Sequence, residues 1–170
     1  GGPFCWLAGD VRPKKILGLL AIEPNGPPFY NVAYGGHKQS HLKNSKTVKK
    51  RSGDKEWYIT ASEPDRPGGI TYLPLTFEPP LRENESLTAE LDTSPTKEDL
   101  VQCYLQKEPA RKLINLQNLP ILILTAEASY HAPYDHGTSN FLKQSGVEHD
   151  FIRLENNKIH GNGHMMMLEK

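Results

Sequence analysis

The sequence predicts an α/β fold, in which the strands of a parallel sheet are joined by crossover helices. Three strand-like segments support this prediction, at residues 16–22, 121–125 and 147–154. The first two are continuous apolar runs, which are typical of strands buried on both faces of a parallel sheet. A helical segment lies between the last two, as a strand–helix–strand crossover requires.

The first part of the chain is predicted to form a helix, a strand and a loop. Residues 3–8 have the pattern of a helix start, and residues 10–13, which end in a proline, terminate the helix. The apolar run 16–22 follows as the first buried strand. Glu23, Pro24 and Asn25 then begin a loop at the carboxyl end of this strand.

The middle of the chain, residues 37–110, is polar, rich in proline and almost without periodic runs. Residues 57–61 have the composition of a short strand, residues 70–80 of a packed loop, and residues 95–106 of a helix. We therefore predict that residues 1–36 and 111–170 form the α/β core. Residues 37–110 are predicted to be an insertion that acts as a lid or cap.

The last part returns to α/β order. After the strand at 121–125, residues 138–144 are predicted to form a helix that ends at Gly146, and residues 147–154 form the third strand. The glycine-rich loop 159–164 follows, and residues 165–168 have the pattern of an apolar helix start. We expect that this helix packs into the core and fixes the loop before it.

The composition excludes several classes of function. Twenty Lys and Arg residues balance twenty Asp and Glu residues, so no charge excess points to nucleic acid or to an anionic membrane as a partner. No apolar run reaches membrane-spanning length. Cys5 and Cys103 fit either two free thiols or one disulfide bridge. Asn84 lies in a glycosylation sequon, which favours secretion weakly because such triplets are common.

Two acidic residues follow strands and are candidates for an acid that orients a catalytic imidazole. Glu23 directly follows the first strand, and Glu127 follows the second. The usual strand-Gly-x-x-Asp pattern would place an Asp where this chain has Ser129. We therefore assign the acid to Glu23 and expect that Glu127 supports the site through hydrogen bonds. The plainer alternative for Glu23 is an acid that caps a loop or pairs with a surface cation.

The glycine-rich loop contains two histidines, His160 and His164. Their spacing of four would suit metal ligands on a helix, but Gly161 and Gly163 argue against a helix, and no third ligand lies nearby in sequence. We therefore predict no metal. Gly163 lets the chain turn just before His164, which favours His164 as the general base and His160 as a residue that braces the loop.

A second group of polar and aromatic residues follows the strand at 121–125. His131, Tyr130 and Tyr134 are candidates for the mouth of a pocket, together with Asp135 and His136. A hydrogen-bonded loop without contact to substrate explains the same residues equally well. Because the ends of parallel strands meet at one edge of a sheet, we expect these residues near Glu23 and the histidine loop.

Residues 159–170 resemble the histidine loop, His-Gly-Asn-Gly/Ser-His-Met-Met-Met, of a branch of fungal and bacterial esterase-like α/β hydrolases. In that branch the acid of the triad is a Glu after strand six, in a context that Ala-Ile-Glu-Pro at residues 21–24 matches. The start Gly-Gly-Pro resembles the end of the Gly-His-Ser-Gln-Gly-Gly-Pro nucleophile elbow. The similarity runs along the chain and is weakest over residues 37–110.

This resemblance implies the C-terminal part of an α/β-hydrolase fold and a Ser-His-Glu triad that cleaves an ester without a cofactor. The nucleophilic Ser would lie two residues before Gly1, so the chain holds the base and the acid but not the nucleophile. The missing N-terminal part would be its partner, since the central strand beside residues 16–22 is also absent. A non-catalytic binding protein, a dehalogenase or a lyase on the same fold are the alternatives.

Overall fold

The computed structural model describes residues 1–29, 32–35, 48–52, 55–61, 66–94 and 97–169. In chain order the described residues form α1 (Gly2–Val11), β1 (Leu19–Ile22), β2 (Val32–Gly35), β3 (Val48–Ser52), β4 (Lys55–Ala61), β5 (Ala89–Leu91), β6 (Tyr104–Gln106), β7 (Ile121–Thr125), α2 (Asp135–Gln144), β8 (Asp150–Arg153) and the short 3₁₀ turns η1 (Leu154–Asn157) and η2 (Met166–Leu168).

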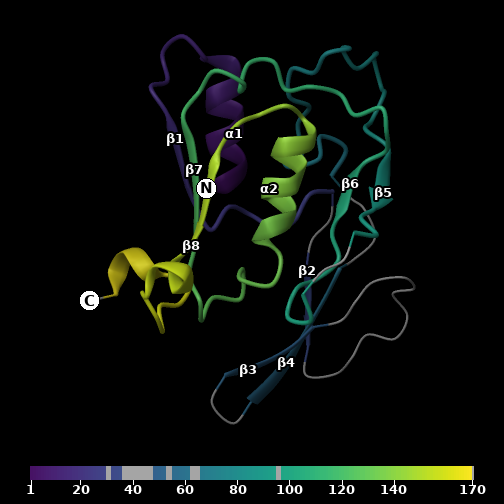
Figure 1. Cartoon of the computed structure of the whole chain (residues 1–170). Helices are drawn as coiled ribbons and strands as arrows, with labels where there is room; N and C mark the ends of the chain where they lie inside the picture. Colours follow the sequence, from purple (N-terminus) through teal and green to yellow (C-terminus); the bar gives the residue numbers. More distant parts are fainter. Residues whose placement is uncertain (30–31, 36–47, 53–54, 62–65, 95–96, 170) are drawn as a thin grey trace.

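A three-stranded parallel sheet in the order β1-β7-β8 organises the fold (Figure 1). Leu19 of β1 pairs with Ile121 of β7, and Leu122 of β7 pairs with Asp150 of β8. Helix α2 connects β7 to β8 as a crossover. The sequence-based prediction of an α/β arrangement with a parallel sheet is therefore confirmed. The strand predicted at 121–125 is β7, whereas β1 and β8 are shorter than the segments predicted for them.

One face of this sheet carries the core. Leu19 and Ala21 of β1 and Ile121 and Ile123 of β7 are buried on this face, in one cluster with residues of both α1 and α2. The alternate residues point to the other face, where Leu20 is 60% exposed. In Figure 1, α1 and α2 lie on the same side of the strands. The expectation that β1 is buried on both faces is wrong for the described residues.

Among the described residues, strand β1 has one unpaired edge, because it forms ladder hydrogen bonds on one side only, with β7. A hollow of about 770 Å³ lies at the opposite end of the sheet from Glu23 and is lined by residues such as Leu20, Pro120, Leu122 and Asp150. Free strand edges and half-covered apolar faces favour association with further polypeptide.

The segment from residue 66 to residue 110 packs onto the same core. Ile70, Leu75 and Phe77 are buried although no helix or regular strand forms around them, as predicted for a packed loop. The helix predicted over residues 95–106 is wrong, because the described part ends in strand β6, which pairs antiparallel with β5. Val101, Cys103 and Gln106 are buried, and strand pairing here overrides the local helical preference. Residues 95–96 lie outside the described residues.

A second antiparallel sheet has the order β2-β4-β3. Its strand β4 includes the short strand predicted at residues 57–61. The lid role of residues 37–110 and the boundaries of the core stay predictions.

The two helices begin and end for local reasons. A proline lies in the first turn of α1, where its missing N–H costs nothing. Helix α2 begins at Asp135, three residues before the predicted start, and carries Lys143 in its last turn, so both charges suit the helix dipole. Gly146, with φ of +75°, allows the turn that ends this segment.

The C-terminal segment differs from the prediction. The apolar residues after His164 form only the short turn η2, and Met165 and Leu168 are 49% and 74% exposed. The expectation that a helix here is anchored in the core is therefore wrong for the described residues. Cys5 and Cys103 are not joined by a disulfide bridge, and burial raises the pKa of Cys5 to about 11. None of the helices in the described residues is long and apolar enough to cross a membrane.

Candidate active site

Glu23 lies directly after β1, at the carboxyl ends of the parallel strands, and its side chain is fully buried. Its backbone has φ of 46°, a left-handed conformation that non-glycine residues rarely adopt and that often marks functional positions. Oε1 accepts a hydrogen bond from the Ala126 backbone N–H at 3.0 Å, and Oε2 accepts one from Ser129 Oγ at 2.7 Å. Both donors come from the loop that follows β7.

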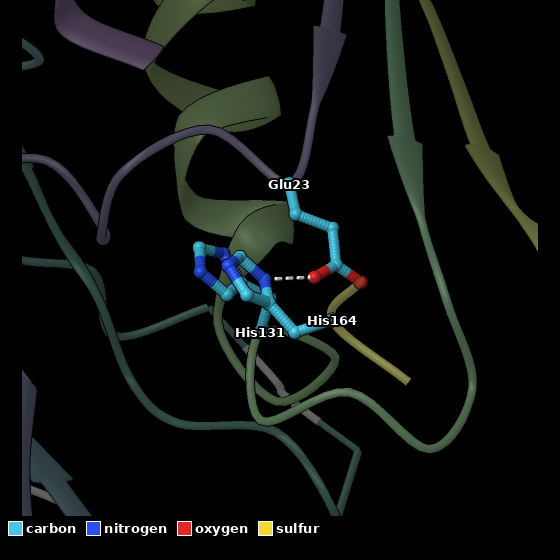
Figure 2. Close-up of side chains that lie close together, drawn as sticks. All are labelled: Glu23, His131 and His164. Carbon is cyan, nitrogen blue, oxygen red and sulfur yellow. Dashed lines mark hydrogen bonds and ion pairs between the residues drawn. The ribbon is translucent and has the colours of Figure 1, made fainter. Parts of the chain in front are cut away.

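The third partner of Glu23 is His164, whose Nδ1 hydrogen-bonds to Oε2 (Figure 2). An ionised carboxylate only accepts hydrogen bonds, so it satisfies all three partners when His164 Nδ1 carries the proton. The neutral ring then has its lone pair on Nε2, the atom that a general base uses. The His164 side chain is 35% exposed, so the ring is open to solvent while its acid is not.

A second histidine stacks on the first. The rings of His131 and His164 have centroids 4.9 Å apart and planes within 6° of parallel (Figure 2). Tyr130 lies against both rings, with centroids 4.6 Å from each. His131 itself is 4% exposed. The structure thus brings Glu23, His164, His131 and Tyr130 together at one edge of the sheet. This was expected from their positions after the carboxyl ends of parallel strands.

His131 has its own carboxylate. Its Nδ1 lies 2.9 Å from Asp135 Oδ1, and the other oxygen of Asp135 accepts a hydrogen bond of 2.7 Å from Thr125 Oγ1. Burial raises the pKa of Asp135, while the hydrogen bonds and charge of His131 and the Thr125 hydroxyl act in the opposite direction. The site therefore contains two histidine–acid pairs whose imidazole rings face one another.

Tyr130 carries a neutral phenol beside these pairs. Burial is the main cause that raises its pKa, and the nearby carboxyl groups of Glu23 and Asp135 raise it further. Tyr134 differs from Tyr130, because it is buried, and its ring contacts that of His131, with centroids 5.0 Å apart. A role for these residues at a pocket mouth stays a prediction.

Glu127 and His160 form a separate contact at the surface. His160 Nδ1 lies 3.2 Å from both carboxylate oxygens of Glu127, and the backbone N–H of Gly161 donates to Oε2 at 3.0 Å. The adjacent Ala128 N–H donates to the Asn162 carbonyl at 3.0 Å. Glu127 and His160 thus connect the loop after β7 to the glycine-rich loop, away from the Glu23 carboxylate.

The donor atoms of Glu23, His131 and His164 lie within 4.8 Å of one another, which raises the question of a metal. A metal bound to both rings must lie in both ring planes, because the nitrogen lone pairs do. Planes that are 6° from parallel and separated by a ring stack share no such point nearby. In addition, each Nδ1 is already bonded to a carboxylate. This geometry does not suit a two-histidine metal site.

Two features of the site were not found by sequence reasoning. Ser129 was noted only as the residue that replaces an expected Asp, yet its hydroxyl donates to Glu23. The pairing of His131 with Asp135 was also missed, although a spacing of four residues is a signal for contact across one turn. His136, grouped with the pocket candidates, instead lies with its Nε2 3.7 Å from Cys103 Sγ.

Comparison with known proteins adds one relationship. No protein-family model matches this chain, and no solved structure matches it. The chain is 38% identical over 172 residues to the protein named probable secreted lipase phiG, from a fungal species (strain ATCC 74256). The alignment covers 99% of this chain and 39% of that protein. The chain is thus similar to a probable secreted lipase along nearly all of its length, and it spans about two fifths of the length of that relative.

Proposed function

We propose that this chain supplies the base and the acid of an ester-cleaving α/β hydrolase with a Ser-His-Glu triad. The observation that carries the proposal is the hydrogen bond between His164 Nδ1 and the buried Glu23 carboxylate, with the ring partly exposed at the carboxyl ends of a parallel sheet. This is the arrangement of the last two members of a serine-hydrolase triad. The similarity to a probable secreted lipase supports the same reaction class.

In the proposed mechanism a Ser located two residues before Gly1 attacks the acyl carbon of the ester. His164 Nε2 takes the proton of the Ser hydroxyl and then passes it to the leaving alcohol. Water then attacks the acyl-enzyme, with His164 as base again, and the acid product leaves. Glu23 holds the ring in the tautomer with the proton on Nδ1 and stabilises the imidazolium that forms. This reaction needs no cofactor.

Glu127 and His160 are proposed to brace the glycine-rich loop rather than to take part in proton transfer. Their contact is exposed and does not include Glu23. Residues 37–110 are proposed to act as a lid that shapes the acyl pocket. Secretion is proposed from the name of the relative and from the sequon at Asn84.

The upstream part of the protein is proposed to complete the sheet beside β1. The free edge of β1, the exposed Leu20 and the hollow at the amino ends of the strands favour a further strand and covering helices at this place. Residues 1–170 expressed alone should therefore be insoluble or molten. A soluble monomer of this segment that unfolds cooperatively would contradict this part of the proposal.

The function is tested on the protein expressed with the sequence upstream of Gly1. We expect hydrolysis of p-nitrophenyl esters and covalent labelling by a fluorophosphonate at a Ser two positions before Gly1, located by mass spectrometry of the labelled peptide. An Asp at that position would favour a dehalogenase, and Ala or Gly would favour a binding protein without catalysis. A wild-type protein that neither cleaves esters nor takes up the probe would refute the esterase proposal.

A further inference from the structure

We propose that His131, held by Asp135, is a positioning residue that aims the His164 ring. This inference rests on the proposed function, in which His164 is the general base. The segment that follows His164 is mostly exposed and forms only the short turn η2, so packing of this segment against the core does not fix the ring.

The hydrogen bond to Glu23 fixes one atom of the His164 ring. A ring held at Nδ1 alone can still rotate about the line of that hydrogen bond, and rotation moves Nε2 away from the nucleophile. The His131 ring lies parallel to the His164 ring at 4.9 Å and presents a flat face to it. A flat neighbour on one face restricts this rotation, because a tilted ring would lose the stack.

His131 is itself held at its ring Nδ1, its backbone carbonyl and its backbone N–H. Its Nδ1 is bonded to the buried Asp135, and its backbone carbonyl accepts hydrogen bonds from the N–H groups of Tyr134 and Asp135 at the start of α2. Its backbone N–H donates to Ser129 Oγ at 3.0 Å. The ring therefore has a defined place in the buried part of the fold and serves as a fixed surface.

Ser129 joins the two histidine–acid pairs. The same hydroxyl oxygen that accepts from the His131 N–H donates its proton to Glu23 Oε2, which also accepts from His164. His131 is therefore linked to His164 in two ways, by hydrogen bonds through Ser129 and Glu23 and by direct stacking of the rings. The loop between β7 and α2 thus supplies the flat face against the His164 ring and, through Ser129, holds the Glu23 carboxylate that bonds the ring.

The test uses two substitutions of His131 in the protein expressed with its upstream sequence. His131→Asn keeps an amide donor near the position of Nδ1 but removes the ring. His131→Phe combined with Asp135→Asn keeps a flat ring and removes the carboxylate that Phe would leave without a partner. If the ring positions His164, the Asn variant loses about 10-fold to 100-fold in kcat with KM nearly unchanged, as expected for a misplaced catalytic group. The Phe variant retains kcat within about threefold of wild type.

The outcomes separate the roles of His131. Equal losses of kcat in both variants would mean that an imidazole nitrogen of His131 acts chemically, and would overturn the positioning role. Wild-type kcat per fluorophosphonate-titrated site in both variants would overturn it as well, because His131 would then be structural only. Thermal unfolding of each variant shows whether a loss of activity follows from a loss of folded protein.

A spectroscopic readout makes the test independent of esterase activity. The proton shared by His164 Nδ1 and Glu23 should give a far-downfield proton NMR resonance that is absent in His164→Ala. We expect this resonance to persist in the Phe variant and to broaden in the Asn variant, where the ring is no longer held. An unchanged resonance in both variants would refute the positioning role. A wild type that lacks ester hydrolysis but shows this pattern would refute the proposed function alone.

Discussion

Two loops of this molecule each carry a histidine bonded through Nδ1 to a carboxylate, and they differ in how they are held. The His131 loop, residues 126–134, lies between β7 and α2, and its histidine and Asp135 are buried. The His164 loop, residues 158–169, follows β8, and its histidine side chain is 35% exposed. One loop is part of the folded core, and the other lies on its surface.

The difference shows how a base is kept both accessible and oriented. The His164 loop gives the ring access to solvent and to an incoming substrate. The orientation comes from the other loop, through Ser129, Glu23 and the face of His131. Access and rigidity are thus supplied by different segments.

The largest effect is expected for His164, and His160, the other histidine of the same loop, provides the control. His164→Ala removes the proposed base and should lower kcat by about 10⁶-fold while leaving the fold intact. His160→Ala removes a surface contact to Glu127 and should change kcat by less than about tenfold. Ester hydrolysis by both variants, with thermal unfolding as the control for folding, checks the prediction. An active His164→Ala variant would refute the triad.

The next effect separates the two acids. Glu23→Gln should lower kcat by about 10⁴-fold, because the imidazolium loses its counter-charge. The amide of Gln would also place a donor among partners that all donate, so some loss of stability should accompany it. Glu127→Gln keeps one acceptor for Gly161 and should cost less than about tenfold. A reversed order in the kinetics would move the acid to Glu127.

Much of the core sheet was predictable from sequence. Strand β7 is a continuous apolar run, Pro24 lies just after β1, and Gly146 separates α2 from β8. The helix predicted over 95–106 was wrong because pairing with β5 and the burial of Val101 and Cys103 outweigh local preference. The exposure of Leu20 was missed because an apolar side chain in a strand does not indicate which segment, if any, packs against it. The nearness of Glu23 and His164 followed from the strand ends.

The partners within the site were harder to predict. The hydrogen bond from Ser129 to Glu23 joins residues that are 106 positions apart in the sequence. The stacked rings of His131 and His164 are 33 positions apart. Hydrophobic periodicity does not report such distances. The same holds for Met165 and Leu168, whose apolar side chains predicted an anchor that the described structure does not contain.

His136, in the first turn of α2, should make the stability of the protein depend on pH in the acid range. Burial is the main cause that lowers the pKa of His136 to about 4, with the charge of Arg153 acting in the same direction. The unfolded chain therefore binds a proton at a higher pH than the folded protein, and stability falls as pH drops from about 6.5 to about 4. His136→Phe should reduce this loss by at most about 3 kcal/mol. Urea unfolding of both proteins at pH 7.5 and 4.5 measures the difference, and equal losses would contradict the prediction.

The smallest expected effect is a difference in stability between two glycine substitutions, one in α2 and one in the His164 loop. A Cβ added at Gly137 in α2 would lie 2.5 Å from Cys103 Sγ and 3.2 Å from Pro28 Cδ, whereas one added at Gly163 would meet only Glu169 Oε1, at 3.1 Å. In α2 the helical preference of Ala gains about 1 kcal/mol, and the overlap costs about 1–3 kcal/mol. Gly137→Ala should therefore destabilise the protein by up to about 2 kcal/mol in urea unfolding, and Gly163→Ala by less than about 0.5 kcal/mol.

Adding Cys103→Ala to Gly137→Ala provides the control for this last comparison. Removing the sulfur relieves the 2.5 Å overlap and leaves the Cβ of residue 103 at 2.8 Å, so the double variant should be somewhat more stable than the sum of the two single changes predicts. Strict additivity would mean that the overlap with the sulfur does not limit the stability of Gly137→Ala. A Gly163→Ala variant that loses as much stability as Gly137→Ala would mean that the His164 loop is as tightly packed as α2, and the contrast between a fixed and an exposed half of the site would fail.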